Sequence, residues 1–496
     1  MSTKHFPKYY KKFSAFIGGN KLLCLIFLIF AFFLLFQHAW DLSWDFSAYV
    51  INAKYLFNQG DYYEVYRAPL VSLIIGIFLI FGKLSEYLYI LFTAVLFFIS
   101  TIYLTDALTE KYWYKYDSSK ERNRLIFLLF SLNPFLIYYS TLIGTELLAL
   151  SFLELFIASL IKKKTSGHYL AMAVLSRYNM LIYIIFLFFQ KNAKRVIVNI
   201  SLFLGVLLPW FIYNRLKWGN YLTSIIDSYS LNISSRSSIS QPLNYLDFIK
   251  VVNFYIPFVL LGLIALLCIF YKNVKSKTYE KKAYFYSLIF LLVFIFSFYD
   301  YASAPFKISR YLFNLAIPIA FFSTYGLLYF FNAEKKHRKI VLSALYTIVL
   351  LFFIFIFIIH YQNRNLDDKY FKAADTIKKL GLTDCIVRST IWVPVNYYTG
   401  NVYYLYDLNY TLSSKSYALV FPCCATIDDP YSMDEIFSYN PLLKTEDFII
   451  ISDPATTNET CSKRSGWDEP MVDDKCNFIK GQFGNFAEKV CNIIDT

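Results

Sequence analysis

Long apolar segments recur along the chain from about residue 22 to residue 361 and then stop. A run of about 20 apolar residues is long enough to cross the hydrocarbon core of a bilayer as a helix. The pattern predicts membrane-spanning helices at 22–39, 86–107, 125–141, 146–161, 196–213, 250–271, 283–300, 311–331 and 340–361. Two further apolar stretches, 69–82 and 168–189, are ambiguous, and they decide the topology.

Clusters of Lys and Arg separate these segments, and basic residues in short loops stay on the cytoplasmic side of a membrane. The clusters lie at 1–21, 109–124, 162–164, 190–195, 272–282 and 332–339. For all of them to share one face, 69–82 must stay at the membrane surface, and 168–189 must enter and return as two helices broken near Ser176 and Arg177. The sequence therefore predicts about eleven crossings, with a cytoplasmic N-terminus and an extracytoplasmic C-terminal region.

The region after residue 361 has a different pattern. One amphipathic helix is expected over 367–379, followed by short β-rich runs at 385–387, 402–405, 417–421 and 448–452. We therefore expect an all-α membrane domain over residues 1–361, whose first outer loop is 40–85, and a small extracytoplasmic α/β domain over residues 362–496.

Composition and charge agree with this division. The chain is 57% apolar and 17% charged, whereas charged residues make up about a quarter of a soluble domain. Residues 1–361 hold 35 basic and 16 acidic residues, a net of +19, and residues 362–496 hold 13 and 19, a net of −6. Because the excess of positive charge lies in membrane loops, we expect no nucleic-acid partner.

Six cysteines in the C-terminal region form an even set: Cys385, Cys423, Cys424, Cys461, Cys476 and Cys491. An even set in an extracytoplasmic region predicts disulfides, whose pairing the sequence leaves open. A zinc site is the rival interpretation, but it lacks CxxC spacing and a neighbouring His. The Lys-rich start could be read as a signal peptide, but no small-residue cleavage site follows it, so we expect an anchor.

Ionisable residues cluster at the predicted outer ends of the apolar segments, where they are costly and therefore functional candidates. They are Asp41, Asp45, Glu146, Arg177 and Arg310. A carboxylate can take a proton from an acceptor hydroxyl as a general base. Arginines can hold phosphate oxygens in a bidentate fork as the leaving charge grows. This combination is typical of group transfer from a lipid phosphate carrier.

Short motifs in this part of the chain have a recognisable order. They comprise Asp45, Tyr49, Ala53, Gly60, Asp61 and Tyr62; Pro69, Phe81 and Gly82; Glu146; Ser176, Arg177 and Tyr178; Pro209, Trp210, Tyr213, Asn214, Gly219 and Asn220; and Arg310, Tyr311 and Pro318. With them, residues 20–360 resemble the GT-C superfamily of membrane glycosyltransferases, of the protein O-mannosyltransferase and lipid A aminoarabinose transferase type.

The resemblance implies a polyprenyl-phosphate-linked monosaccharide as donor and an inverting transfer to a hydroxyl on a protein, glycan or lipid. It implies Asp45 as the base, Glu146 as a second catalytic acid, and Asp41, Tyr49, Arg67, Arg177, Asn214 and Arg310 as substrate-binding residues. Arg67 stands where the aminoarabinose-type pattern has a Lys. No WWDYG-like motif follows the last apolar segment, which disfavours oligosaccharyl transfer.

Structural roles compete with these assignments. Asp45, Asp41 and Glu146 could simply begin helices, Arg177 could form a structural pair with Glu154, and Arg310 could reach the lipid headgroups. A lipid-linked sugar transporter or flippase is the alternative function, because it would also use broken helices with buried charges. A divalent metal held by Asp45 and Glu146 stays open, and no other cofactor is expected.

Overall fold

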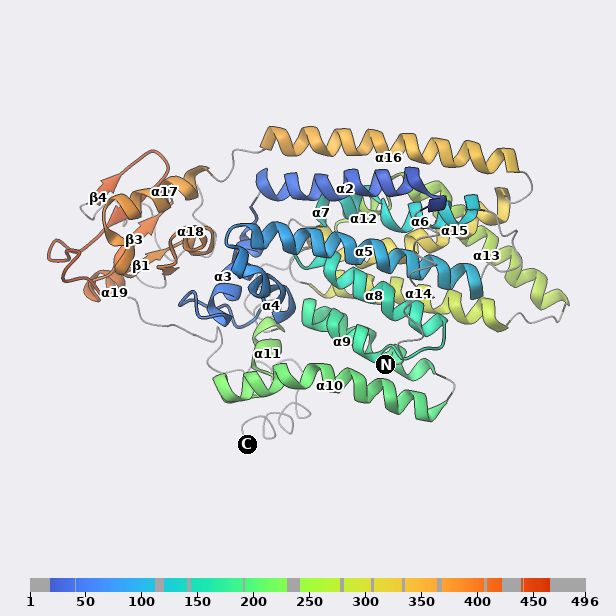
Figure 1. Cartoon of the computed structure of the whole chain (residues 1–496), viewed down its shortest axis with the longest axis horizontal. Helices are drawn as coiled ribbons and strands as arrows, with labels where there is room; N and C mark the ends of the chain where they lie inside the picture. Colours follow the sequence, from blue (N-terminus) through green and yellow to red (C-terminus); the bar gives the residue numbers. More distant parts are fainter. Residues whose placement is uncertain are drawn as a thin grey trace.

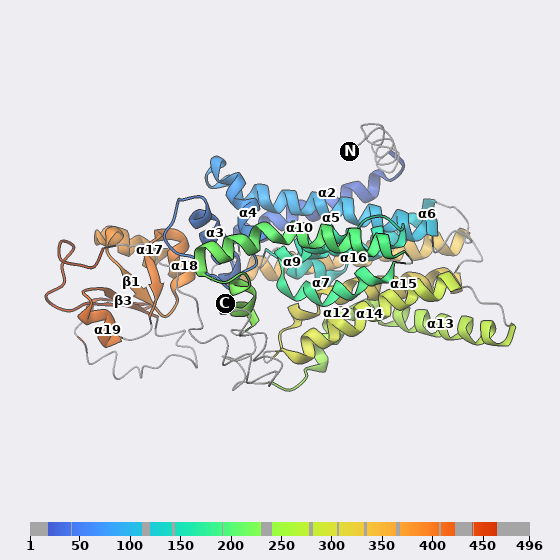
Figure 2. The ribbon, with the colours of Figure 1, turned by 90° about the horizontal axis from the view of Figure 1, so that it is seen from below.

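The computed structural model describes residues 18–40, 42–111, 120–140, 144–190, 192–229, 241–276, 281–304, 307–331, 335–363, 368–405, 408–421, 439 and 441–463. Long helices run roughly side by side along the longest axis of the molecule (Figure 1). The C-terminal sheet and its helices lie beyond one end of these helices, next to α3 (Trp44–Leu56), and the view from below shows the same arrangement (Figure 2).

The helical part has the following further elements. They are α2 (Lys21–Trp40), α4 (Pro69–Phe78), η1 (Leu79–Phe81), α5 (Leu84–Lys111), α6 (Lys120–Ser131), α7 (Pro134–Tyr139), α8 (Glu146–Ile161), α9 (Gly167–Ser176), η2 (Tyr178–Phe189), α10 (Ala193–Trp218), α11 (Thr223–Tyr229), α12 (Tyr245–Val252), η5 (Asn253–Tyr255), α13 (Ile256–Ser276), α14 (Lys281–Ser303), η6 (Ser309–Leu315), α15 (Ala316–Phe331) and α16 (Lys335–Asn363).

Among the described residues, five helical segments are long and apolar enough to cross a membrane. They are Lys21–Trp40, Leu84–Lys111, Ala193–Trp218, Tyr245–Cys268 and Ser309–Leu328. Several other apolar segments are shorter, so the expected count of about eleven crossings is not confirmed.

Two apolar segments are broken by recognisable residues. The apolar segment 125–141 divides into α6 and α7, because Pro134 lacks the N–H that would continue the helix and Asn133 caps the new one. The break expected near Ser176 and Arg177 is confirmed, since α9 ends at Ser176, Arg177 is extended and the 3₁₀ helix η2 follows.

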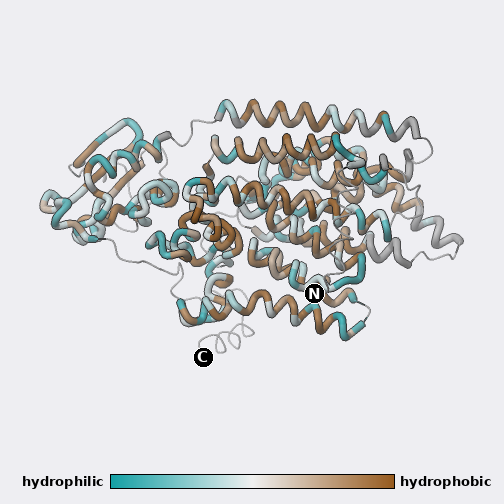
Figure 3. The backbone as a smooth tube through the Cα atoms, viewed as in Figure 1, coloured by the Kyte–Doolittle hydropathy of each residue, from teal (hydrophilic) through white to brown (hydrophobic). Residues whose placement is uncertain are grey.

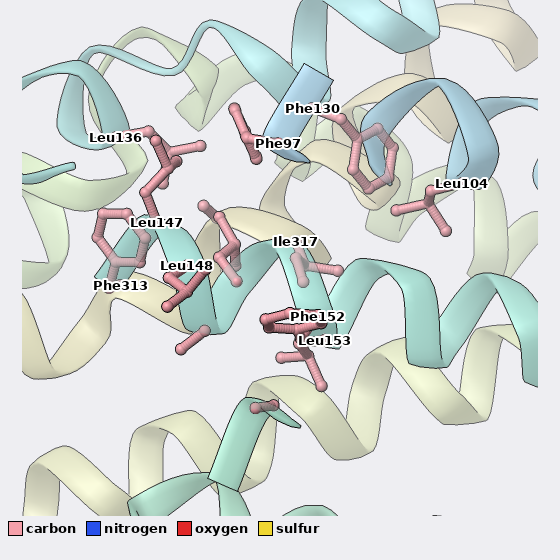
Figure 4. Packing of buried hydrophobic residues seen from close by; sticks show 14 of the residues in the cluster. Phe97, Leu104, Phe130, Leu136, Leu147, Leu148, Phe152, Leu153, Phe313 and Ile317 are labelled. Atoms are coloured by element: carbon pink, nitrogen blue, oxygen red, sulfur yellow. The ribbon is translucent and has the colours of Figure 1, made fainter. Parts of the chain in front are cut away.

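The core of the bundle surrounds α8. Every residue of this helix is buried, which explains why its sequence is apolar on all sides. Figure 4 shows Leu147, Phe152 and Leu153 of α8 packed among side chains that include Phe97 of α5 and Ile317 of α15. In contrast, α10 and α16 carry large exposed apolar side chains, and Figure 3 shows their middle parts as strongly hydrophobic, which suits helices that face lipid.

The C-terminal part contains a five-stranded sheet of order β2-β1-β3-β5-β4. Its elements are α17 (Asp368–Lys379), η7 (Leu382–Asp384), β1 (Val387–Ser389), α18 (Trp392–Thr399), β2 (Val402–Tyr404), α19 (Leu408–Ser413), β3 (Tyr417–Val420), β4 (Pro441–Lys444) and β5 (Ile449–Ile451). Strand β1 pairs in parallel with β2 and β3, and the remaining pairs are antiparallel. The expected small α/β fold is therefore confirmed, although β4, α18 and α19 were not predicted.

A disulfide joins Cys385 to Cys461, with their Cα atoms 5.7 Å apart. It ties the segment before β1 to the segment after β5, and both sulfur-bearing residues belong to the core beneath the sheet. The other predicted disulfide cysteines, Cys423, Cys424, Cys476 and Cys491, lie outside the described residues. Cys24 and Cys268 are free thiols, as their places in apolar helices predict.

Helix α18 packs the sheet-containing part against α3 and the loop that follows it. The rings of Trp44 and Trp392 meet edge to face with their centroids 4.8 Å apart. The indole N–H of Trp392 donates to the hydroxyl of Tyr62 at 2.7 Å. Lys54 Nζ donates to the carbonyl oxygen of Tyr397 at 3.0 Å. The sheet-containing part is thereby joined to the helix that carries Asp45.

Candidate active site

Asp45 lies in the first turn of α3. Ser43 caps the helix, and its hydroxyl accepts a hydrogen bond from the backbone N–H of Phe46 at 3.1 Å. A carboxylate in the first turn is favoured by the helix dipole. The cap thus fixes the start of α3 and, with it, the position of the Asp45 carboxylate.

Two arginines from distant parts of the chain bind the Asp45 carboxylate. Arg67 Nη1 donates to Oδ1 at 2.7 Å, and Arg310 Nη1 donates to Oδ2 at 2.5 Å. Arg67 comes from the loop before α4, and Arg310 comes from η6. The Asp45 side chain keeps 21% of its surface exposed, so this ion cluster opens to the outside of the protein.

Glu64, which the sequence analysis did not select, orients Arg67. Its carboxylate accepts hydrogen bonds from Arg67 Nε and, at 2.8 Å, from the hydroxyl of Tyr66. The side chain of Asn52 holds the backbone of Glu64 with two hydrogen bonds, of 3.0 and 2.8 Å. The only sequence signal for Glu64 is its spacing of three residues from Arg67. Arg67 is thus held by an acid on each side.

The charges around Asp45 keep it ionised. Burial alone would raise the pKa of Asp45, but the positive charges of Arg310 and Arg67 and their hydrogen bonds outweigh burial and hold the pKa well below its usual range. Burial raises the pKa of nearby Tyr49 to about 12, although Arg67 opposes the shift and the charges of Asp45 and Glu146 add to it. Tyr49 is therefore a neutral hydroxyl beside an ionised Asp45.

Glu146, the first residue of α8, makes the second ion pair of the site. Its Oε1 accepts from Arg177 Nη1 at 2.8 Å, and its Oε2 accepts from the hydroxyl of Thr145 at 3.0 Å. The turn before α8 packs closely against α3. Gly144 in this turn has φ +90°, and a Cβ there would lie 2.8 Å from the ring of Phe46, so glycine permits the close approach. The alternative pair of Arg177 with Glu154 is wrong, since Arg177 bonds to Glu146 instead.

The ring of Tyr311 lies close to a guanidinium group of each ion cluster. Its centroid is 5.6 Å from Arg310 Cζ and 5.8 Å from Arg177 Cζ. The predicted residues Asp45, Tyr49, Arg67, Arg310, Glu146 and Arg177 are therefore brought together in one site.

Asn214 is engaged differently from the other predicted residues. Its Nδ2 donates to the carbonyl of Trp210 at 2.8 Å, and its Oδ1 accepts from the backbone N–H of Ser224 at 2.9 Å. These bonds fasten α11 to α10. Trp210 and Ser224 in turn contact the hydroxyl of Tyr178, which lies 3.4 Å from the carbonyl of Arg67. Asn214 thus stabilises the group of residues that holds Tyr178 against the backbone of Arg67. Asp41 lies outside the described residues.

The carboxylates of the site are arranged for guanidinium groups. Asp45 contacts Arg67 and Arg310, and Glu146 contacts Arg177. Within the described part of the chain, no three His, Cys, Asp or Glu side chains gather in a way that could hold a metal ion. The partners of Asp45 and Glu146 in this site are therefore arginines.

The fold is similar to that of a solved transferase. The crystal structure of ArnT from Cupriavidus metallidurans bound to undecaprenyl phosphate matches with a TM-score of 0.60 and 10% sequence identity, over 89% of this chain and 99% of that chain. The same protein in the apo state matches with a TM-score of 0.57 and 9% identity, over 90% and 100%. No family model matches the sequence, and no curated protein matches it. The chain thus has the fold of ArnT.

Proposed function

We propose that the protein is a membrane glycosyltransferase that moves a monosaccharide from a polyprenyl-phosphate carrier to a hydroxyl acceptor with inversion at the sugar. The observation that carries the proposal is the cluster of Asp45, Arg67 and Arg310 at the start of α3. It combines a carboxylate that can accept a proton with two cations that can hold a phosphate. The likeness to ArnT, which was solved with undecaprenyl phosphate, supports this choice of carrier.

The proposed reaction uses Asp45 as the general base. The acceptor oxygen attacks the anomeric carbon from the face opposite the phosphate, and Asp45 takes the hydroxyl proton. The bond between the anomeric carbon and the phosphate oxygen breaks, and its electron pair leaves with the phosphate. A phosphodiester with one negative charge becomes a phosphomonoester with two. Arg67 and Arg310 stabilise the added charge, so the leaving group needs no proton.

Donor binding also prepares the base. In the structure both oxygens of Asp45 accept from guanidinium groups, which lowers the affinity of the carboxylate for a proton. A phosphate bound to Arg67 and Arg310 competes for the same N–H donors. Asp45 then regains free lone pairs and a higher proton affinity when the donor is present. Glu64 keeps Arg67 in place during this exchange.

Glu146 and Arg177 form the second part of the proposed site. The ring of Tyr311 lies close to the guanidinium groups of both Arg177 and Arg310, and the Glu146 side chain is almost fully buried. We assign the pair to the sugar rather than to the phosphate, because neither Glu146 nor Arg177 bonds to Asp45, whose partners Arg67 and Arg310 are assigned to the phosphate. The acceptor is a hydroxyl on a protein, glycan or lipid, which approaches the exposed side of Asp45 at an extracytoplasmic surface.

The direct test is chemical cleavage of a donor. Purified protein in detergent is incubated with radiolabelled undecaprenyl-phosphate glucose, mannose and galactose, and the release of undecaprenyl phosphate is measured with and without added acceptor hydroxyls. We expect release from at least one donor. If every donor stays intact but moves across the bilayer of reconstituted vesicles, the protein is a transporter and the proposal is wrong.

A further inference from the structure

A second polar cluster lies close to Arg177, in residues that the proposed reaction leaves without a role. Asn179 follows the break at Arg177, and Asp300 lies in the last turn of α14. Asn179 Nδ2 donates to Asp300 Oδ2 at 2.6 Å. Arg177 is close enough to interact electrostatically with Asp300, although its direct partner is Glu146. One guanidinium is therefore shared between two carboxylates.

The position of Asp300 is costly for a purely structural residue. It lies in the last turn of α14, a mostly apolar helix. Acidic groups in apolar membrane helices are usually functional. Among the described residues it forms no salt bridge, and its side-chain hydrogen bond comes from the neutral amide of Asn179. Neither the phosphate chemistry nor the packing of α14 requires a carboxylate at this position.

Two buried amide oxygens in this region also lack hydrogen-bond donors. They are Oδ1 of Asn179 and Oδ1 of Asn314, and the Asn314 residue is 4% exposed. Asn314 lies on η6, the element that carries Arg310 and Tyr311. Tyr183 is near both Asn314 and Asp300, so the two polar side chains belong to one region. Buried polar atoms in folded proteins nearly always have partners, and a ligand with several hydroxyl donors would supply them.

The second polar cluster and the phosphate-binding arginines adjoin the same aromatic ring. The guanidinium carbons of Arg310 and Arg177 lie 5.6 and 5.8 Å from the ring centroid of Tyr311. A monosaccharide joined through its anomeric oxygen to a phosphate on Arg310 would extend one ring away from that phosphate. Its far hydroxyls would then reach the region of Arg177, Asn179 and Asp300.

We propose that Asn179, Asp300 and Asn314, together with the Glu146–Arg177 pair, form the subsite that binds the sugar of the donor. This inference rests on the proposed function. Carboxylate and amide oxygens accept from sugar hydroxyls, and the guanidinium and amide N–H groups donate to them. The class of ligand is a neutral, multiply hydroxylated hexose. An acidic sugar would add a third negative charge beside Glu146 and Asp300, which share one guanidinium.

The test compares a lipid phosphate without a sugar with three derivatives that carry one. Affinities of the detergent-solubilised full chain are measured for undecaprenyl phosphate and for its glucose, mannose and galactose derivatives. The variants are Asp300→Asn, which keeps the shape of the side chain, and Asn179→Ala. The matched control is Asp106→Asn, a carboxylate on α5 that pairs with Lys162 and lies far along the chain from this subsite. Binding of undecaprenyl phosphate reports in every variant whether the protein is folded.

The wild type is expected to bind at least one hexose derivative about tenfold more tightly than undecaprenyl phosphate, as hydrogen bonds to charged groups allow. Asp300→Asn and Asn179→Ala are expected to lose most of this preference and to bind undecaprenyl phosphate normally, whereas Asp106→Asn keeps the preference. Variants that retain the full preference, or a wild type without one, would overturn the subsite. Failure of the wild type to bind any of these lipids would instead reject the proposed function itself.

Discussion

Asp45 is held by two guanidinium groups, and this pairing determines how the protein should respond to pH. The pKa of Asp45 is held low, so its ionised form is present above that pKa and is lost only as pH falls through it. We predict that kcat/KM, which reports ionisations of the free protein, stays flat as pH falls from 8 to about 4, where an Asp of ordinary pKa near 3.9 would already be about half protonated.

Removing one arginine should shift this profile. In Arg310→Gln the largest favourable charge is lost, while burial still raises the pKa of Asp45. The acid limb of kcat/KM should therefore move to higher pH, in addition to a loss of activity. A pH profile measured for wild type and variant checks this, and an unchanged limb would show that Arg310 does not control the ionisation of Asp45.

Two glutamates on α8 provide a matched comparison. Glu146 pairs with Arg177, whereas Glu154 accepts from the hydroxyls of Ser100 and Thr101 at 2.6 and 2.9 Å, and its Oε1 has no partner. Glu146→Gln should lower kcat/KM at least about tenfold, because Arg177 loses its charged partner. Glu154→Gln keeps an oxygen for both hydroxyls and should stay within about twofold of wild type. If both variants lose kcat/KM equally in steady-state assays, Glu146 has a structural role only.

Charged residues at the predicted outer ends of the apolar segments are conspicuous in the sequence, which is why Asp45, Glu146, Arg177 and Arg310 could be selected. Arg67 was selected from the family resemblance. The sequence did not reveal Glu64, Asn179 or Asp300. Glu64 looks like an ordinary polar loop residue, and Asp300 looks like the polar end of a helix. Their partners come from other elements, so only the packing of those elements identifies them.

At the scale of elements, the sequence pattern located the long helices and the break near Ser176 and Arg177, but not the type of helix that follows this break. Segment η2 is a 3₁₀ helix of 12 residues, YNMLIYIIFLFF, in which nearly every position is apolar. A period of 3.0 residues cannot be distinguished from 3.6 when no polar position marks a face. Strand β4 was missed for a related reason, because it is mostly exposed and its side chains do not alternate in polarity.

Close contact between α13 and α15 depends on glycine. A Cβ at Gly262 would lie 2.0 Å from the carbonyl oxygen of Phe322, and one at Gly326 would lie 2.5 Å from the backbone nitrogen of Gly262. Small residues allow helices to approach in this way. We predict that Gly262→Ala separates the two helices and costs about 1–3 kcal/mol, the usual penalty for overpacking.

Thermal unfolding in detergent measures this effect. Gly205→Ala on α10 is the control, because a Cβ there meets nothing within 4 Å. Its unfolding temperature should be unchanged or slightly higher, since alanine favours the helix. If Gly262→Ala is as stable as this control, α13 and α15 do not pack as the structure describes.

At the scale of the whole molecule, the sheet-containing part is connected to the active site by hydrogen bonds. Trp392 donates to Tyr62 at 2.7 Å, and the Tyr62 hydroxyl lies 3.5 Å from Glu64 Oε1. Glu64 orients Arg67, which bonds to Asp45. No sequence pattern indicates this connection, because it joins residues more than 300 positions apart whose types are common in any aromatic-rich interface.

Trp392→Phe keeps an aromatic ring and removes the donor at the start of this connection. We predict that kcat falls about fivefold, the value of one hydrogen bond of about 1 kcal/mol, with little change in KM for the donor. The control is Tyr397→Phe, which removes another bond between the same two parts, to Glu86 at 2.7 Å, but does not lead to Asp45. Equal kinetics for the two variants would show that Trp392 only holds the parts together.

The central claim is that Asp45 is the base of a lipid-phosphate glycosyltransferase, and one measurement tests it most directly. Release of undecaprenyl phosphate from the preferred radiolabelled donor, in the presence of acceptor, is compared for wild type, Asp45→Asn and the control Asp106→Asn, alongside binding of undecaprenyl phosphate. We expect that Asp45→Asn binds the lipid and loses at least about a hundredfold in release, as for a general base, while Asp106→Asn retains both. Undiminished release by a correctly folded Asp45→Asn protein would contradict this claim.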